Sequence, residues 1–178
     1  MTSDLAKAVK RCSKPETVAL LVVRDRDHHR FDIMPLGWKM WASAQPRRMA
    51  FSVAQAHYSC ALLERERECT LAWPGPALID GVIKCGSLSG RDTDKAALAG
   101  WNLLPAVHVG SGLLEQAVVN LECRVEQSVP TGDHTLFIYS IAEGHVSERD
   151  ERVIFTLNDE SLFNHAGQYK GYRFGTFS

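Results

Sequence analysis

The stretch VNLECRV, residues 119–125, alternates strictly between apolar and polar side chains. Because successive side chains of a strand point to opposite faces of a sheet, this period predicts a strand with one core face and one wet or paired face. A Pro130-Thr131-Gly132-Asp133 turn follows and leads into a second largely apolar stretch over residues 134–146. Together these features predict an antiparallel hairpin.

Three more stretches, residues 17–25, 47–55 and 68–75, are bounded by polar or turn residues and are rich in residues typical of buried strands. Between the last two, residues 57–67 predict a helix with Tyr58, Ala61, Leu62 and Arg65 on one face. A short helix with a Ser cap is predicted over residues 3–11. Mostly short strands with few helices favour a closed antiparallel barrel over a doubly wound parallel sheet.

The chain has 178 residues, so we expect one domain, 1–178. Its 20 basic and 21 acidic residues give a net charge of −1, which argues against nucleic acid or an anionic membrane surface as partner. The longest clearly apolar run, Val18 to Val23, is too short to span a membrane, and no signal peptide pattern opens the chain. We therefore expect a cytoplasmic protein.

Five cysteines without a C-x-x-C pair argue against a disulfide framework and a zinc site, so most are expected to be reduced core residues. No metal site is predicted, because adjacent His28 and His29 would point to opposite faces and fit a solvated hairpin loop. Leu88 stands where a nucleophile elbow needs serine, and GSGLLE (residues 110–115) lacks the third glycine of a dinucleotide fingerprint.

The run SGRDTDK, residues 89–95, combines four charges with small residues directly before a predicted helix. One interpretation is an N-cap at Asp92 or Thr93, with Gly100 ending the helix. The other is an anion site, because a helix N-terminus with nearby basic side chains favours a phosphate group. The two interpretations use the same end of the helix.

Four stretches in order resemble the flavin reductase-like family, whose members are FMN-binding split barrels and include ferric reductases and flavoredoxins. They are DIMPLGW (32–38), SVAQAHYSCALLE (52–64), CGSLSGRDTDKAALAGW (85–101) and NLECRVEQSVPTGDHTLFIYSI (120–141). The resemblance covers about residues 15–175. It implies a mainly β fold, an antiparallel Greek-key split β-barrel with a few short helices.

The resemblance also implies a non-covalent FMN site. The residues that match its cofactor-binding positions are Met34, Pro35, Leu36, Gly37, Trp38, Ser52, Val53, Ala54, His57, Ser59, Cys85, Ser89, Gly90, Arg91 and Lys95. Asp32, Pro35 and His57 depart from the family, which often has Asn, Thr and Arg there. The first two changes each remove a side-chain donor, so backbone amides are expected to carry more of the contact.

Several of these residues have a plain structural alternative. Ser52 packs in a strand, and Ser59 can cap the helix and also contact phosphate. Trp38 and Trp41 are core or dimer residues more often than stacking partners. His57 fits a core or surface role equally well.

His134 matches a position near the nicotinamide side and is the predicted catalytic residue, with a simple turn histidine as its alternative. The resemblance implies a homodimer in which NAD(P)H reduces FMN, which then reduces flavin, a ferric chelate or a protein acceptor. Tyr169, Tyr172, Phe174 and Phe177 are expected at the dimer surface. Two alternatives stay open: an FMN electron carrier without NAD(P)H activity, and a flavin-free binding module.

Overall fold

The computed structural model describes residues 15–149, 151–157 and 173–175, together with Leu5, Val9, Cys12 and Ser13. Apart from Leu5 and Val9, the helix predicted over residues 3–11 lies outside the described residues. Tyr169, Tyr172 and Phe177 of the aromatic tail lie outside them as well.

The described chain is mainly β and its sheets are antiparallel, which confirms the predicted fold class. The strands are β1 (Glu16–Thr17), β2 (Ala19–Asp25), β3 (Arg30–Leu36), β4 (Lys39–Ser43), β5 (Arg48–Ala54), β6 (Glu68–Trp73), β7 (Leu103–Pro105), β8 (Gly112–Leu114), β9 (Val119–Thr131), β10 (His134–Val146), β11 (Phe155–Leu157) and β12 (Arg173–Gly175). The helices are α2 (Tyr58–Glu66), the 3-10 turn η1 (Pro76–Leu78), α3 (Ile79–Ser87) and α4 (Lys95–Ala99).

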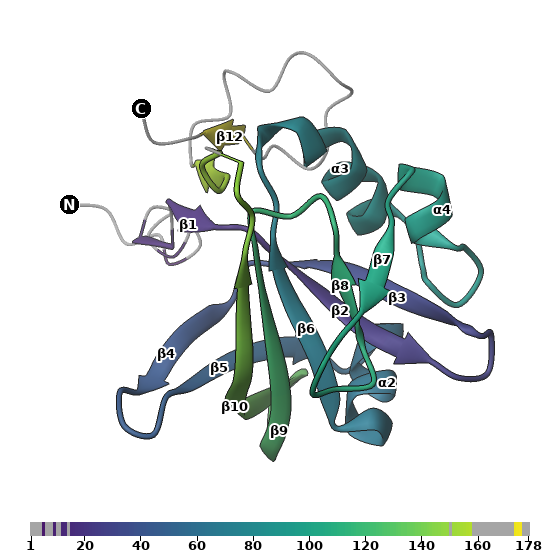
Figure 1. Ribbon diagram of the computed structural model, residues 1–178. Coiled ribbons are helices and arrows are strands. Elements are labelled where there is room, and N and C mark those ends of the chain that lie inside the picture. Colours follow the sequence, from purple (N-terminus) through teal and green to yellow (C-terminus); the bar gives the residue numbers. More distant parts are fainter. Residues whose placement is uncertain are drawn as a thin grey trace.

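The main sheet has seven strands in the order β3-β2-β6-β9-β10-β5-β4. Its two edge strands, β3 and β4, are consecutive in the chain and are joined only by Gly37 and Trp38. The sheet therefore curls back on itself at this corner, where the amide of Ser52 donates to the carbonyl of Trp38 at 2.9 Å. Along the described strands the two edges do not pair with each other, so the barrel is split and not closed as the strand pattern predicted (Figure 1).

Both faces of β2 are buried, and its alternation separates two apolar clusters. Leu21 and Val23 pack with Phe51 and Phe137 in one cluster. Leu20 and Val22 pack in the other, which also holds Val82 of α3 and Trp101 after α4. Since one strand supplies side chains to both clusters, the helices are fastened directly to the wall of the barrel.

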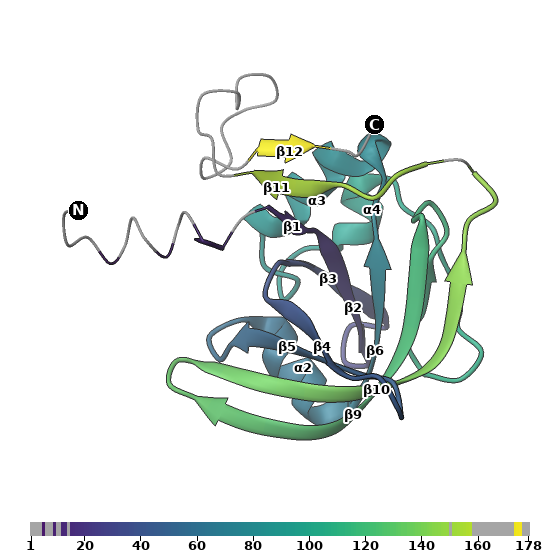
Figure 2. The same ribbon diagram turned by 90° about the vertical axis from the view of Figure 1, so that its left-hand side faces the viewer.

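The helices occupy two separate places around the barrel. Helices α3 and α4 pack against each other and against β3, at the end where the small sheet β1-β11-β12 lies (Figures 1 and 2). Helix α2 connects β5 to β6 and packs against β2, β3, β5 and β6. Strand β3 is thus in contact with α2, α3 and α4. In the described chain no helix is long and apolar enough to cross a membrane.

The hairpin predicted from residues 119–125 is confirmed, as β9 pairs antiparallel with β10. Its polar face is paired as expected: the Asn120 side chain accepts from the amide of Leu114 at 2.9 Å, and Glu122 accepts from two loop amides. The prediction that most cysteines lie in the core is also confirmed, because Cys60, Cys69, Cys85 and Cys123 are buried.

The helix predicted over residues 57–67 is present as α2, and its buried residues are Ser59, Cys60, Leu62 and Leu63. Of the predicted face, Leu62 is buried, whereas Ala61 and Arg65 are exposed. Arg65 forms an ion pair with Asp27 at 2.7 Å.

The cap of α4 is Asp94 and not Asp92 or Thr93. The Asp94 carboxylate accepts from the amide of Ala97 at 3.0 Å. Gly100 ends the helix as predicted, in the left-handed conformation with φ of 68°. The helix therefore begins later than expected, and residues 89–92 are left to form a turn before it.

Candidate functional site: two joined chambers beside strand β3

Two adjoining cavities gather most of the predicted site residues. The first, of about 340 Å³, is lined by Met34, Pro35, Leu36, Gly37, Trp38, Ser52, Val53, Ala54, His57 and His134 among the predicted residues. The second, of about 230 Å³, is lined by Met34, His57, Ser59, Cys85, Ser89, Gly90 and Lys95. We call them the ring chamber and the anion chamber. Met34, His57 and Gly86 line both, so the two cavities lie side by side.

The ring chamber is built at the split corner of the barrel. Strand β3 and the Gly37-Trp38 link form one wall, β5 and the start of β10 form another, and α3 with the small sheet covers the rest. Most of its lining residues are apolar, as is typical of ligand pockets.

The anion chamber lies between the start of α2 and the Ser89–Asp92 turn. His57 stands at the N-cap of α2, and its side chain does not cap the helix. A helix N-terminus concentrates backbone N–H donors and the positive end of the helix dipole. The turn supplies Ser89 and Gly90 opposite this helix. The chamber therefore offers mainly backbone donors to a negatively charged group.

A buried ion pair closes the floor of the anion chamber. Asp32, only 2% exposed, lies 3.0 Å from the Nζ of Lys95 and accepts a hydrogen bond from the Ser59 hydroxyl. Lys95 is itself 3% exposed and also donates to the carbonyl of Ile33 at 2.8 Å. We call Asp32, Ser59 and Lys95 the Asp32 cluster. Two residues predicted to bind the cofactor, Ser59 and Lys95, are therefore engaged with a carboxylate of the protein.

The Asp32 cluster requires a glycine at position 90. A Cβ atom at position 90 would collide with the carboxylate of Asp32. The absence of a side chain therefore lets the turn sit directly on the ion pair. Cys85 lines the chamber, and burial raises the pKa of its thiol to about 12, which keeps it protonated at neutral pH.

Arg91 lies outside both chambers. Its guanidinium carbon is 5.3 Å from the centre of the Tyr58 ring, a cation–π distance, and the residue is exposed. Tyr58 lines the anion chamber, and its hydroxyl donates to the buried Asp25 at 3.0 Å. Arg91 therefore lies at the rim of the anion chamber, next to the Tyr58 ring that lines it.

At the far lip of the ring chamber, His134 stacks on Trp38 with ring centres 4.8 Å apart. Its Nδ1 lies 2.7 Å from the carboxylate of Asp133, and this hydrogen bond lowers the pKa of Asp133. An ionised carboxylate only accepts, so Nδ1 is the protonated nitrogen and Nε2 is left for another partner.

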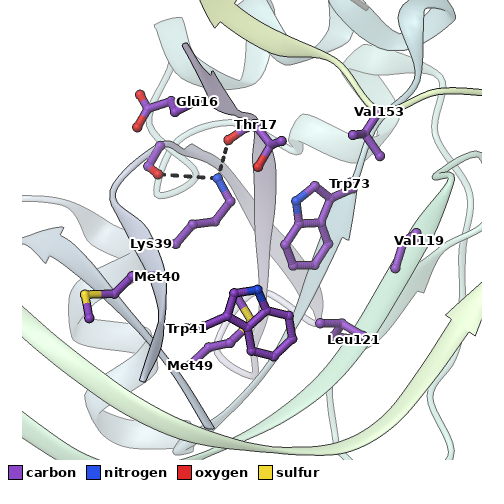
Figure 3. Close-up of a pocket in the computed structure, with 11 residues that line it drawn as sticks. Glu16, Thr17, Lys39, Met40, Trp41, Met49, Trp73, Val119, Leu121 and Val153 are labelled. Atoms are coloured by element: carbon purple, nitrogen blue, oxygen red, sulfur yellow. Dashed lines mark hydrogen bonds between the residues drawn. The ribbon is translucent and has the colours of Figure 1, made fainter. Parts of the chain in front are cut away.

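The largest of these cavities, about 580 Å³, lies on the other side of Gly37 and holds few of the predicted residues (Figure 3). Lys39 points toward the β1 end of it and donates to the carbonyls of Thr17 and Gly37. Trp41, Met49 and Leu121 gather at the other end, so Trp41 faces this apolar cavity and not the ring chamber. We call it the apolar cavity. With little chemistry beyond Lys39 and Glu16, it fits a contact surface better than a reaction site.

Sequence reasoning missed the residues that complete the ring chamber: Glu16, Val18, Val82, Ile83, Gly86, Thr156 and Phe174. Val82 and Ile83 precede Cys85 and Gly86 by one helical turn, so a helix prediction for residues 79–87 would have found them. Thr156 and Phe174 come from β11 and β12, which carry no such local signal. Phe174, expected at a dimer surface, packs against the cluster that holds Val82.

Residues 11–172 match the family model described as a flavin reductase like domain, so the chain belongs to that family. The curated relatives it matches are uncharacterised. An Archaeoglobus fulgidus protein is 31% identical over 67% of this chain and 66% of its own length. The chain thus spans slightly less than two thirds of that relative.

Solved structures share the fold. Flavoredoxin of Desulfovibrio vulgaris (Miyazaki F) superposes with a TM-score of 0.78 at 21% identity, covering 100% of this chain and 94% of its own. The NADH:FAD oxidoreductase SgcE6 of Streptomyces globisporus has a TM-score of 0.78 at 15% identity, covering 100% and 98%. The FMN-binding protein of Thermus thermophilus, bound to 1-cyclohex-2-enone, has a TM-score of 0.72 at 23% identity, covering 92% and 86%. At these identities the likeness shows the fold alone.

Proposed function

We propose that this protein is an FMN-binding oxidoreductase that uses NAD(P)H to reduce flavin or ferric chelates. The observation that carries the proposal is the pair of joined chambers, one mostly apolar and one facing a helix N-terminus, in a chain of the flavin reductase-like family. Their volumes fall within the range of ligand sites when taken together. The FMN-binding protein and the NADH:FAD oxidoreductase that share its fold support the same proposal.

The residues present fit FMN. The isoalloxazine ring suits the mostly apolar chamber between β3, β5 and α3, and the phosphate suits the chamber at the start of α2. Asp32 does not oppose the phosphate, because Lys95 neutralises it. We propose that backbone amides near Ser59, Ser89 and Gly90 hold the phosphate, with His57 and Arg91 at the rim.

Bound FMN supplies the redox chemistry by accepting a hydride equivalent and passing electrons on. The protein binds and orients its ligands. Trp38 and His134 form a stacked pair at the lip of the ring chamber, where a nicotinamide would approach. Asp133 fixes the Nδ1 proton of His134, so its Nε2 is oriented to hold or receive a proton.

Anaerobic reduction tests the activity. The yellow FMN-loaded protein is mixed with NADH or NADPH and the loss of flavin absorbance is followed. We expect bleaching, and His134→Asn is expected to slow it by about 10²-fold when the protein is saturated with FMN. His29→Asn, in the exposed β2–β3 turn, is the matched control and should bleach at the wild-type rate.

The second candidate is an FMN electron carrier reduced by another protein, favoured by the flavoredoxin that shares the fold and by the absence of a recognisable nucleotide motif in the sequence. FMN binding without bleaching by either nucleotide would select it. Failure to bind FMN at all would overturn both and leave the flavin-free module.

We also propose that the protein works as a homodimer in the cytoplasm. Strand β4 is a sheet edge that exposes Met40 and Trp41, 61% and 60% accessible, beside the apolar cavity. Aromatic and Met side chains on an exposed patch are typical of interfaces. The buried unpaired cysteines suit a reducing compartment. Sedimentation should give a dimer, and Trp41→Glu should give a monomer; a monomeric wild type would refute the proposal.

A further inference from the structure

Strand β3 presents two charged residues to the Ser89–Asp92 turn. Arg30 and Asp32 are two positions apart, so their side chains lie on the same face of the strand. Asp32 meets Gly90 from the chamber side, as described above. Arg30 reaches the backbone: its Nη2 donates to the carbonyl of Gly90 at 2.6 Å and to the carbonyl of Arg91 at 2.9 Å.

Two amides of the turn bond within it. The amide of Arg91 donates to the Ser89 hydroxyl oxygen at 3.2 Å, and the amide of Asp92 donates to the Ser89 carbonyl at 3.3 Å. The peptide groups on both sides of Arg91 are thus held at both ends, with their carbonyls on Arg30. Ser89 and Gly90 are left lining the anion chamber.

Arg30 is itself held by a buried anion. Its Nε lies 3.9 Å from the carboxylate of Asp25, which is fully buried and also accepts from Tyr58 and from His28. Burial acts to raise the pKa of Asp25, but these donors outweigh it and the pKa lies below the ordinary value, so Asp25 is ionised at neutral pH. A fixed negative charge therefore holds the guanidinium beside the turn.

We propose that Arg30 is a positioning residue for phosphate recognition, which acts by holding the Ser89–Asp92 turn in its anion-receiving shape. The inference rests on the proposed FMN site and assigns a role to a residue that does not line either chamber. Without the two charge-assisted hydrogen bonds, a turn that contains glycine has more conformations to choose from. The phosphate would then have to order the turn as it binds, which lowers its affinity.

The test compares FMN with riboflavin, which has the same ring system without the phosphate. Affinities for both are measured by fluorescence quenching in the full-length wild type, Arg30→Met and Arg26→Met. Arg26, in the adjacent turn, pairs with Glu66 at 2.6 Å and does not bond to the Ser89–Asp92 turn, so it is the matched control. We expect Arg30→Met to weaken FMN binding about tenfold and leave riboflavin affinity unchanged, while Arg26→Met changes neither.

The outcomes separate this inference from the proposed function. If the wild type binds neither flavin, the proposed function fails. If it prefers FMN and Arg30→Met keeps the full preference, Arg30 has no positioning role. An equal loss for FMN and riboflavin in Arg30→Met would show general damage to the fold and would also overturn the inference. Arg30→Lys is expected to restore only part of the preference, because one ammonium cannot reproduce the guanidinium geometry.

Discussion

Two buried carboxylates on different strands of the main sheet are satisfied in different ways. Asp32 of β3 meets the ammonium of Lys95 and the hydroxyl of Ser59 in the wall of the anion chamber. Glu122 of β9 is fully buried and accepts from the amides of Val107 and His108 and from the His145 ring. One carboxylate joins the elements that border a cavity, and the other fastens a loop to the sheet. We infer that the first serves binding and stability together, whereas the second serves stability alone.

The largest expected effect comes from breaking the Asp32 cluster. Lys95→Met leaves the Asp32 carboxylate buried without its cation, which should cost about 3 to 5 kcal/mol of unfolding free energy. The double variant Asp32→Asn/Lys95→Met removes both charges and should recover a large part of that loss. Urea unfolding of the apoproteins measures both. A loss below about 1 kcal/mol in Lys95→Met would mean that the pair does not hold the chamber together.

In contrast to Lys95, Arg91 should affect FMN affinity and leave the unfolding free energy nearly unchanged. If its guanidinium reaches the phosphate from the Tyr58 ring, Arg91→Ala should weaken FMN binding by about 1.5 to 3 kcal/mol, tenfold to more than a hundredfold. Because Arg91 is exposed, the unfolding free energy should change by no more than about 0.5 kcal/mol. Arg91→Lys should recover part of the affinity. Equal FMN affinity in wild type and Arg91→Ala would remove Arg91 from the site.

Glu122 should affect stability and its pH dependence without affecting flavin binding. Burial acts to raise its pKa, but the two loop amides and His145 outweigh it, so the folded pKa lies below the ordinary 4.5. The lowered pKa stabilises the fold above pH 4.5, and this contribution is lost as pH falls through the folded value. Glu122→Gln should therefore cost about 1 to 2 kcal/mol at pH 7 and flatten the pH dependence below 4.5.

Unfolding curves from pH 7 to 3, with FMN titrations at pH 7, check this prediction. A parallel pH profile in wild type and Glu122→Gln would show that another group controls the acid loss. A weakened FMN affinity in this variant would erase the distinction between the two carboxylates.

The parts of the fold that were predictable are those set by nearby residues. The alternation of residues 119–125 and the Gly132 turn define the β9–β10 hairpin locally, and the DIMPLGW and SGRDTDK stretches located both chambers through family resemblance. The Asp32–Lys95 pair joins residues 63 positions apart in the sequence, so no local pattern predicts it. No local pattern indicates the contacts of Phe174 in β12 either. Arg30 could not be found from the sequence because its partners are backbone carbonyls, which carry no sequence signal.

The most direct test of the account is a titration of the refolded apoprotein with FMN, followed by quenching of flavin fluorescence. The joined chambers predict saturation at about one FMN per chain, with a band shift of the bound flavin and a preference for FMN over riboflavin. No saturation even at a large excess of FMN, from a protein that unfolds cooperatively and is therefore folded, would contradict the central claim that these chambers form a flavin site.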